Sequence, residues 1–240
     1  MNITGRGIVI QCTRYSETSV IARIFTREMG MQSFMVPGVR SNKGAIRSSH
    51  LQPLNLLELV MQIRQSASLQ RIRELRCTPV LSSIHYDPKK SGIAMFMLEI
   101  LNRAIREEER NEKLFDFLWT SIQILDLKEQ GIAPFPIHFL VQLSRYLGFY
   151  PAAETYQEGY CFDMEEGGFF LQVSATEEDK LIAQSLFKLL NKDFDQLEEV
   201  KLGHAMRQQV LNLLLNYYRI HLHNFKEFNS PAILKEILSA

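Results

Sequence analysis

The stretch with the clearest chemical character is a basic loop. Residues 30–54 (GMQSFMVPGVRSNKGAIRSSHLQPL) carry Arg40, Lys43 and Arg47 at intervals of three and four residues, with no acidic residue in the stretch. Its glycines relax the backbone, and its serines can donate hydrogen bonds to phosphate oxygens. The loop is therefore either an anion-binding element or a solvated loop without a partner.

A second candidate surface comes from the alternation of residues 19–28 (SVIARIFTRE). In a strand, Ile21, Arg23, Phe25 and Arg27 lie on the face opposite Val20, Ala22 and Ile24. Phe25 could stack on a base while the two arginines hold phosphates. The alternative is that Phe25 packs inside the barrel or against the next domain and the arginines are solvated.

A third group of cations lies in residues 69–80. Arg71 and Arg73 share one face of the expected strand, and Arg76 follows them. A salt bridge to Glu58 or Glu74 would account for one of these three charges and leave the others available.

Residue types for catalysis or metal binding are not grouped in this sequence. The three cysteines are far apart, His221 and His223 fall on different faces of a helix, and no P-loop, GxGxxG, GxSxG or HExxH motif occurs. We therefore expect no enzyme activity. Cysteines outside any disulfide framework, and the absence of a signal peptide or an apolar run of about 20 residues, indicate a cytoplasmic protein with no membrane role.

The elements that position the basic residues are expected to be five strands followed by helices. β-branched and apolar segments at 7–15, 19–28, 32–36, 54–64 and 69–80 predict a small closed sheet, for which the five-stranded OB-fold barrel is the economical solution. Helical periodicity follows at 89–106, 111–128, 134–147, 176–190, 203–225 and 230–238.

Two domains are therefore expected: an all-β OB-fold domain at 1–80 and a mainly α-helical domain at 81–240. A hairpin excursion at about 149–172 interrupts the helices, with 166–168 as its turn. Residues 1–79 hold 11 Lys/Arg against 4 Asp/Glu, which leaves 16 against 23 for residues 80–240. The charges of +7 and −7 predict that the barrel meets a polyanion and the helical domain meets solvent or protein.

Two stretches resemble a known family. The segment GIVIQCTRYSETSVIARIFTREMG, with the PGVRSNKG loop and LQPLNLLEL, resembles the OB domain of RecO, a bacterial recombination mediator. FLVQLSRYLGFYP with the acidic hairpin resembles the start of that family's carboxy-terminal domain. The YSET segment is similar to versions from the Bacteroidetes group.

The resemblance implies a DNA repair protein, in the bacterial cytoplasm near the nucleoid, that binds single- and double-stranded DNA and anneals complementary strands. It also implies that the chain works with RecR, docks the acidic, apolar-ended tail of SSB, and thereby helps RecA to load. The helix that carries Phe139, Leu143 and Arg145 resembles the family's tail-binding region and is the candidate site. The alternative is that Phe139 and Leu143, four residues apart, are ordinary core positions. Without the resemblance, an RNA-binding adaptor or a nuclease accessory subunit remains open.

Some members of the family bind zinc through four cysteines in the hairpin excursion. This sequence keeps only Cys161 there, so we expect no zinc and no other cofactor. Packing among aromatic residues is expected to hold the hairpin instead, namely Tyr156, Tyr160, Phe162, Phe169 and Phe170.

Overall fold

A computed structural model describes residues 1–39, 46–64, 67–105, 110–222 and 225. Its contacts divide the chain into two compact units. The first contains Met1–Tyr86 and Ile100–Asp126, and the second contains Asp87–Glu99 and Leu127–Ala240. The division predicted at residue 80 stays a prediction, as does the helix predicted at 230–238, which lies outside the described residues.

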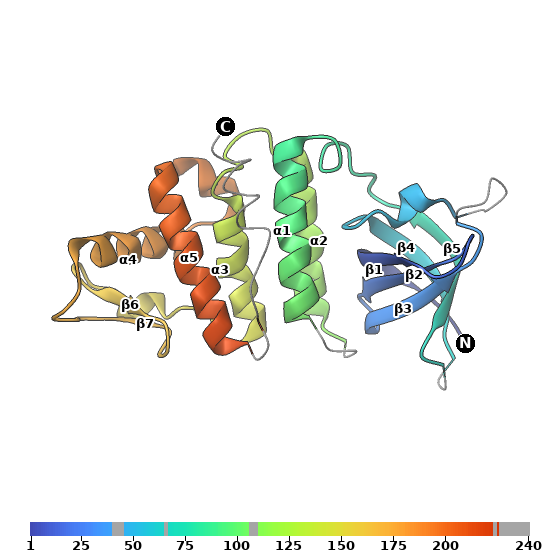
Figure 1. Cartoon of the computed structure of the whole chain (residues 1–240), viewed down its shortest axis with the longest axis horizontal. Helices are drawn as coiled ribbons and strands as arrows, with labels where there is room; N and C mark the ends of the chain where they lie inside the picture. The colour runs from blue at the N-terminus through green and yellow to red at the C-terminus, as the bar shows by residue number, and fades with distance from the viewer. Residues whose placement is uncertain (40–45, 65–66, 106–109, 223–224, 226–240) are drawn as a thin grey trace. The chain divides into compact units, whose positions relative to one another are not determined.

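The amino-terminal unit contains a closed five-stranded barrel (Figure 1). Its strands are β1 (Asn2–Arg14), β2 (Val20–Thr26), β3 (Gly30–Val36), β4 (Leu56–Gln62) and β5 (Gln70–Cys77), with a short 3-10 turn, η1 (Ser48–Leu51). The order β1-β2-β3-β5-β4, with only the β3–β5 pair parallel, confirms the predicted OB-fold architecture.

β1 begins five residues earlier than predicted and closes the barrel. Asn2–Ile8 pairs with β4, and Gly7–Arg14 pairs with β2. Close packing requires a glycine at position 7 of this strand, because a Cβ there would lie 2.5 Å from Ile24 Cγ2 and 2.8 Å from Leu59 Cδ1. Low strand propensity at Gly5 and Gly7 therefore concealed a strand that close packing requires.

The inner faces of the strands form one apolar core, as their alternation predicted. Its buried members are Val9, Val20, Ala22, Ile24, Phe34, Val36, Val39, Leu51, Leu57, Leu59, Met61 and Ile72.

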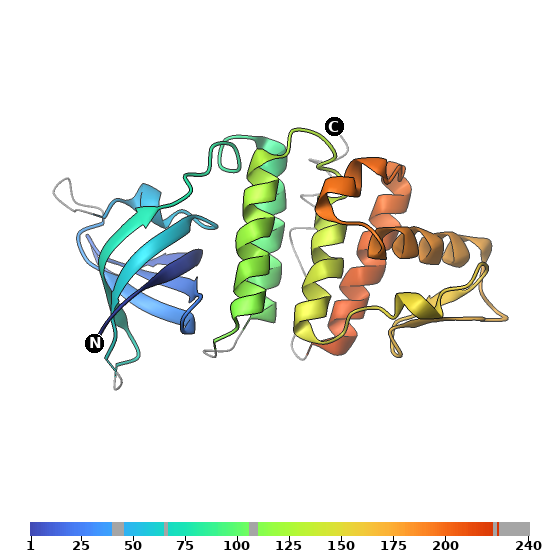
Figure 2. The same cartoon turned by 180° about the vertical axis from the view of Figure 1, so that it is seen from behind.

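The helices are α1 (Pro88–Ala104), α2 (Glu112–Leu127), α3 (Phe135–Leu147), α4 (Glu177–Leu190) and α5 (His204–His221), with 3-10 turns η2 (Ala153–Thr155) and η3 (Phe194–Glu199). Figure 2 shows α3, α4 and α5 from behind, together with the hairpin formed by β6 (Cys161–Asp163) and β7 (Gly168–Phe170). None of the described helices is long and apolar enough to cross a membrane.

Local signals placed several helix ends correctly. Gly148 has φ 88° and ends α3, and its amide donates to the Ser144 carbonyl. Thr176 caps α4 in a reciprocal pair with Asp179, at the residue where the helix was predicted to begin. α5 ends at His221, before the predicted residue 225, and Phe225 packs on Tyr218 with ring centroids 5.3 Å apart. No glycine or proline lies within the nine residues after His221 to mark this boundary in the sequence.

One buried carboxylate ties the segment after the barrel to α2. Asp126 accepts hydrogen bonds from the amides of Ser82, Ser83 and Ile84, each at 2.8 Å. Burial alone raises the pKa of Asp126, but these backbone hydrogen bonds outweigh burial, so the pKa lies below its usual value. The carboxylate therefore satisfies three amides that the fold removes from water.

Replacing Asp126 should destabilise the amino-terminal unit strongly. In Asp126→Ala the three amides lose their acceptor, and we expect a loss of about 3–5 kcal/mol in the free energy of unfolding. Urea unfolding followed by circular dichroism measures this loss. Glu17→Ala, which removes an exposed carboxylate from the β1–β2 connection of the same unit, is the control and should cost much less; equal losses would contradict the role given to Asp126.

A buried histidine in α3 links the stability of the carboxy-terminal unit to pH. His138 is fully buried and packs edge-on against Phe194 with centroids 4.5 Å apart, and neither ring nitrogen forms a well-aligned hydrogen bond with a described residue. Burial lowers its pKa to about 4, against smaller opposing effects of Asp193 and the Leu189 carbonyl. The folded chain therefore keeps this imidazole neutral.

The pKa of His138 makes folding sensitive to mild acid. Between the unfolded value of 6.5 and about 4, the unfolded chain binds the extra proton, so stability falls as pH decreases through this window. The loss approaches about 3 kcal/mol near pH 4. In His138→Leu, thermal unfolding should lose this pH dependence while remaining like the parent at pH 7 to 8. A variant that keeps the full acid sensitivity would show that another group titrates.

Candidate nucleic-acid interface

The outer face of β2 is covered by α2, which belongs to the same unit. Phe25 is 1% exposed, and its ring centroid lies 5.9 Å from that of Phe115. A ring packed in this way has no free face for a base. The predicted stacking role of Phe25 is therefore wrong, and the alternative, in which it packs against the following helices, is correct.

Arg27 is part of the same contact. Its guanidinium donates to both carboxylate oxygens of Asp116, at 2.9 and 3.1 Å, and lies 2.7 Å from Glu112 Oε2. The hydrogen bond to Asp116 raises the pKa of Arg27, and in return it lowers the pKa of Asp116. Because two carboxylates already compensate this charge, Arg27 ties α2 to the barrel and is poorly suited to hold phosphate.

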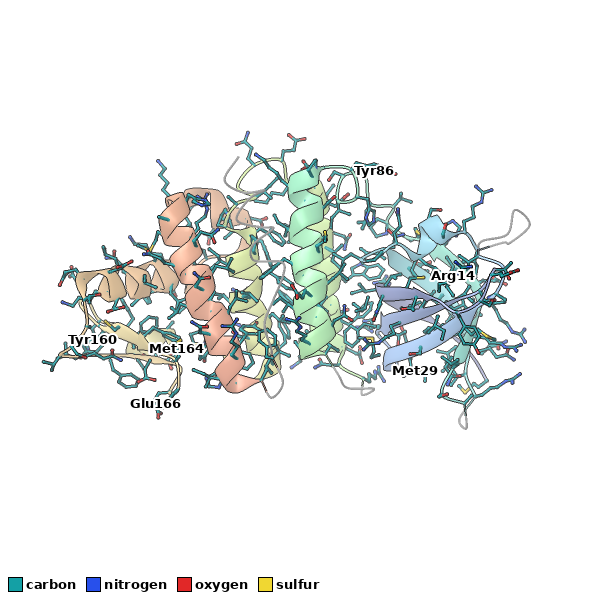
Figure 3. All side chains as sticks on the ribbon, viewed as in Figure 1. Arg14, Met29, Tyr86, Tyr160, Met164 and Glu166 are labelled. Carbon is teal, nitrogen blue, oxygen red and sulfur yellow. The ribbon has the colours of Figure 1, made fainter. Side chains whose placement is uncertain are left out.

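Arg23 faces a groove of about 560 Å³. It is half-buried, and its Nη1 donates to Asn102 Oδ1 at 3.3 Å. Arg64 and Arg110 also line the groove, and no acidic side chain lines it within the described part of the chain. Figure 3 labels Met29, another lining residue, on the barrel. The geometry thus groups three arginines from three separate segments.

Two of these three arginines were not assigned to the DNA surface from sequence. Arg64 lies in the β4–β5 connection, where the buried Gln70 side chain accepts from the Arg64 amide at 2.8 Å and donates to the Ala67 carbonyl at 2.7 Å. Arg110 follows α1 and also pairs with Glu112. A lone arginine in a connection gives no periodic signal, so only the fold brings these residues together.

β5 presents a second set of cations. Arg71 and Arg73 are exposed, and neither forms an ion pair with a described residue. Arg76 pairs with Glu58, so a salt bridge explains one of the three charges, as predicted. Arg47 is also exposed, immediately before η1. Arg40 and Lys43, the other cations of the basic loop, lie outside the described residues.

The predicted tail-binding site on α3 is wrong in its apolar part. Phe139 and Leu143 are fully buried, because they point into the core of the carboxy-terminal unit. Arg145 is exposed, and its guanidinium carbon lies 4.1 Å from the centroid of the Tyr150 ring. The helix therefore offers a cation at this position without the apolar pocket beside it.

Aromatic packing holds the hairpin in part as predicted. The Phe169 ring lies 5.2 Å from the rings of both Tyr156 and Phe162. Phe170 is 43% exposed, and neither Phe170 nor Tyr160 forms a ring contact with a described aromatic residue. The predictions for these two residues were wrong, because Phe170 alternates with Phe169 in β7 and points to the opposite side.

Reactive thiols and metal ligands are not assembled among the described residues. Burial raises the pKa of Cys12, Cys77 and Cys161, which disfavours the nucleophilic thiolate. No group of three or more His, Cys, Asp or Glu side chains in the described part could hold a metal ion. The expected absence of zinc stays a prediction.

Comparison with known proteins identifies the family. The family model Recombination protein O N terminal matches residues 1–79, and Recombination protein O C terminal matches residues 85–155. The DNA repair protein RecO of Phocaeicola vulgatus is 36% identical over 237 residues, covering 97% of this chain and 98% of the relative. That of Flavobacterium psychrophilum is 37% identical over 243 residues and covers both chains completely.

These relatives include members of the Bacteroidetes group, as the YSET segment predicted. Both halves of the chain match the family in order, and the barrel has the strand order expected of the family's first domain. The chain therefore belongs to the RecO family of DNA repair proteins of the recombination pathway.

Proposed function

We propose that this chain binds single- and double-stranded DNA through its barrel, anneals complementary strands, and acts with RecR to help RecA replace SSB. The observation that carries the proposal is a set of arginines that form no ion pair with a described residue: Arg71 and Arg73 on β5, and Arg23 and Arg64 in the groove. Such cations neutralise phosphates and release counterions without reading sequence.

A grip on the backbone suits strand annealing. Bases must remain free to pair, so a protein that anneals strands gains from contacts to phosphates and loses from contacts to base edges. Burial of Phe25 removes one stacking platform from the barrel surface, which supports a binding mode dominated by charge. We place this activity in the bacterial cytoplasm, at the nucleoid, without a catalytic step.

Docking of the SSB tail requires a cation for its acidic residues and an apolar site for its end. Arg145 is an exposed cation on α3. Because Phe139 and Leu143 are buried in the core, the apolar part of the tail needs a different surface. RecR and the tail are partners that the family resemblance supports, with no interface assigned to RecR.

The arginines of β5 should govern the salt dependence of DNA binding. In the double variant Arg71→Gln, Arg73→Gln, the slope of log affinity against log salt should decrease in magnitude by about 1.4 for single strands, because two phosphate contacts are lost. Fluorescence anisotropy of a labelled oligonucleotide, titrated at several salt concentrations, measures the slope.

Arg76→Gln is the matched control, since Arg76 lies on the same strand and already pairs with Glu58. We expect it to change the slope much less. The assignment of β5 fails if the control and a single variant at Arg71 or Arg73 have equal effects, or if the double variant binds like the parent.

Annealing of SSB-coated complementary oligonucleotides tests the function directly. We expect the chain to accelerate annealing, and we expect the acceleration to depend on the SSB tail. Slow annealing in its presence, or acceleration that persists with tail-less SSB, would contradict the respective part of the proposal. The alternative role, as a nuclease accessory subunit or an RNA adaptor, is tested in parallel. Labelled DNA and RNA are incubated with the chain and magnesium, and cleavage is measured.

A further inference from the structure

The hairpin and the start of α4 carry a concentration of negative charge. Residues 149–180 contain eight acidic residues and one basic residue, Lys180. Lys180 is already paired with Glu177 at 2.6 Å. Most of the acidic side chains are exposed, including Glu165 and Glu166 at the turn of the hairpin. The sign of this surface repels nucleic acid, so the proposed DNA binding does not account for it.

A cavity of about 460 Å³ opens within this acidic region. Its apolar lining comes from the hairpin, α4 and α5, and its acidic lining residues are Asp163, Glu165 and Asp179. In Figure 3, Met164 lies between the hairpin and α5, and Glu166 points away from the hairpin turn. The main apolar lining residues are Cys161, Phe162, Met164, Ile182, Leu213 and Ile220.

Apolar side chains are exposed in the same segment. Leu171 is 70% exposed, Val173 is fully exposed, and Phe170 is 43% exposed. Ile220, which lines the cavity from α5, is 46% exposed. Apolar groups gathered beside a cavity and rimmed by charge are typical of a protein-binding surface.

The walls of the cavity are held in place by hydrogen bonds. His221 Nε2 lies 2.9 Å from the Met164 carbonyl, which fixes the hairpin turn to the end of α5. Asp163 accepts from the amides of Glu165 and Glu166, and Asp179 caps Thr176. The cavity therefore exists before any partner binds, which lowers the ordering cost of docking.

We propose that this surface, defined by the cavity and its rim of Asp163, Glu165 and Asp179, docks a basic segment of a partner protein. One apolar side chain of the segment occupies the cavity, and flanking Lys or Arg residues face the acidic rim. Charge complementarity selects this occupant, since the rim opposes an acidic peptide as strongly as it opposes DNA.

A second copy of this chain is a less suitable occupant, although its barrel is basic. Contact between the acidic hairpin of one copy and the barrel of the next uses two different surfaces. Such a heterologous contact propagates into open assemblies unless its rotation closes a ring. A separate basic partner can bind the acidic surface without producing an open assembly.

The test uses the full chain and three labelled model peptides of equal length. One contains Lys and Leu, one Lys and Ser, and one Glu and Leu, so that charge and apolar character are varied separately. We expect the Lys–Leu peptide to bind at least about tenfold more tightly than either control peptide in fluorescence anisotropy. Equal binding of the Lys–Leu and Lys–Ser peptides would overturn the role of the cavity.

Two variants locate the binding to this surface. Ile220→Ser and Glu165→Gln each change a lining side chain with no structural hydrogen bond, whereas Asp163 and Asp179 are left intact because they hold the local fold. Each variant should weaken Lys–Leu binding about tenfold. Met95→Ser and Glu129→Gln, exposed residues outside the cavity lining, are matched controls and should leave it unchanged.

Unchanged affinity in both lining variants, or equal weakening in the controls, would overturn the proposal. Sedimentation of the chain alone tests the other possible occupant, a second copy of the chain. Concentration-dependent assembly that Ile220→Ser abolishes would assign the surface to a second copy and reject the separate partner. A chain that stays monomeric and binds the Lys–Leu peptide through Ile220 and Glu165 supports it.

Discussion

The packing of α2 on the outer face of β2 is the constraint on which the use of the barrel depends. The Phe25 ring packs against the Phe115 ring, and Arg27 forms a bidentate ion pair with Asp116. The buried Asp126 fixes the connecting segment to the same helix. An OB-fold barrel could bind a DNA strand on several of its faces, but the contact with α2 covers one of them. The arginines that we propose for nucleic acid, on β5, in the β4–β5 connection and in the groove beside Arg23, are not tied up in this ion pair.

The sequence predicted the barrel well because strand alternation is a local property. It separated the two faces of β2 correctly, since Val20, Ala22 and Ile24 are all buried in the core. It could not predict what covers the outer face, because Phe115 is 90 residues away from Phe25 along the chain. Phe139 and Leu143 illustrate the same limit: apolar spacing on a helix predicts a buried stripe equally well whether core or partner buries it.

The groove shows why part of the candidate site was missed. Arg23 was accessible to sequence reasoning because it lies in an alternating strand, whereas Arg64 and Arg110 lie in connections whose course depends on tertiary contacts. Gln70 positions the Arg64 segment through hydrogen bonds to backbone atoms. A buried glutamine after a loop is uncommon enough to suggest such a clamp, but its partners emerge only from the fold.

The two parts of the chain carry net charges of opposite sign, which suits them to different partners. In the proposed function, the basic barrel attracts the phosphate backbone at long range, and the acidic hairpin of the same chain limits where a DNA strand can settle. A chain that was basic throughout would hold strands over its whole surface and hinder their pairing. In the proposed function, the net positive charge of residues 1–79 and the burial of Phe25 let the chain concentrate two DNA strands while leaving their bases free. The acidic surface is then available to proteins, whose recognition follows the opposite sign of charge.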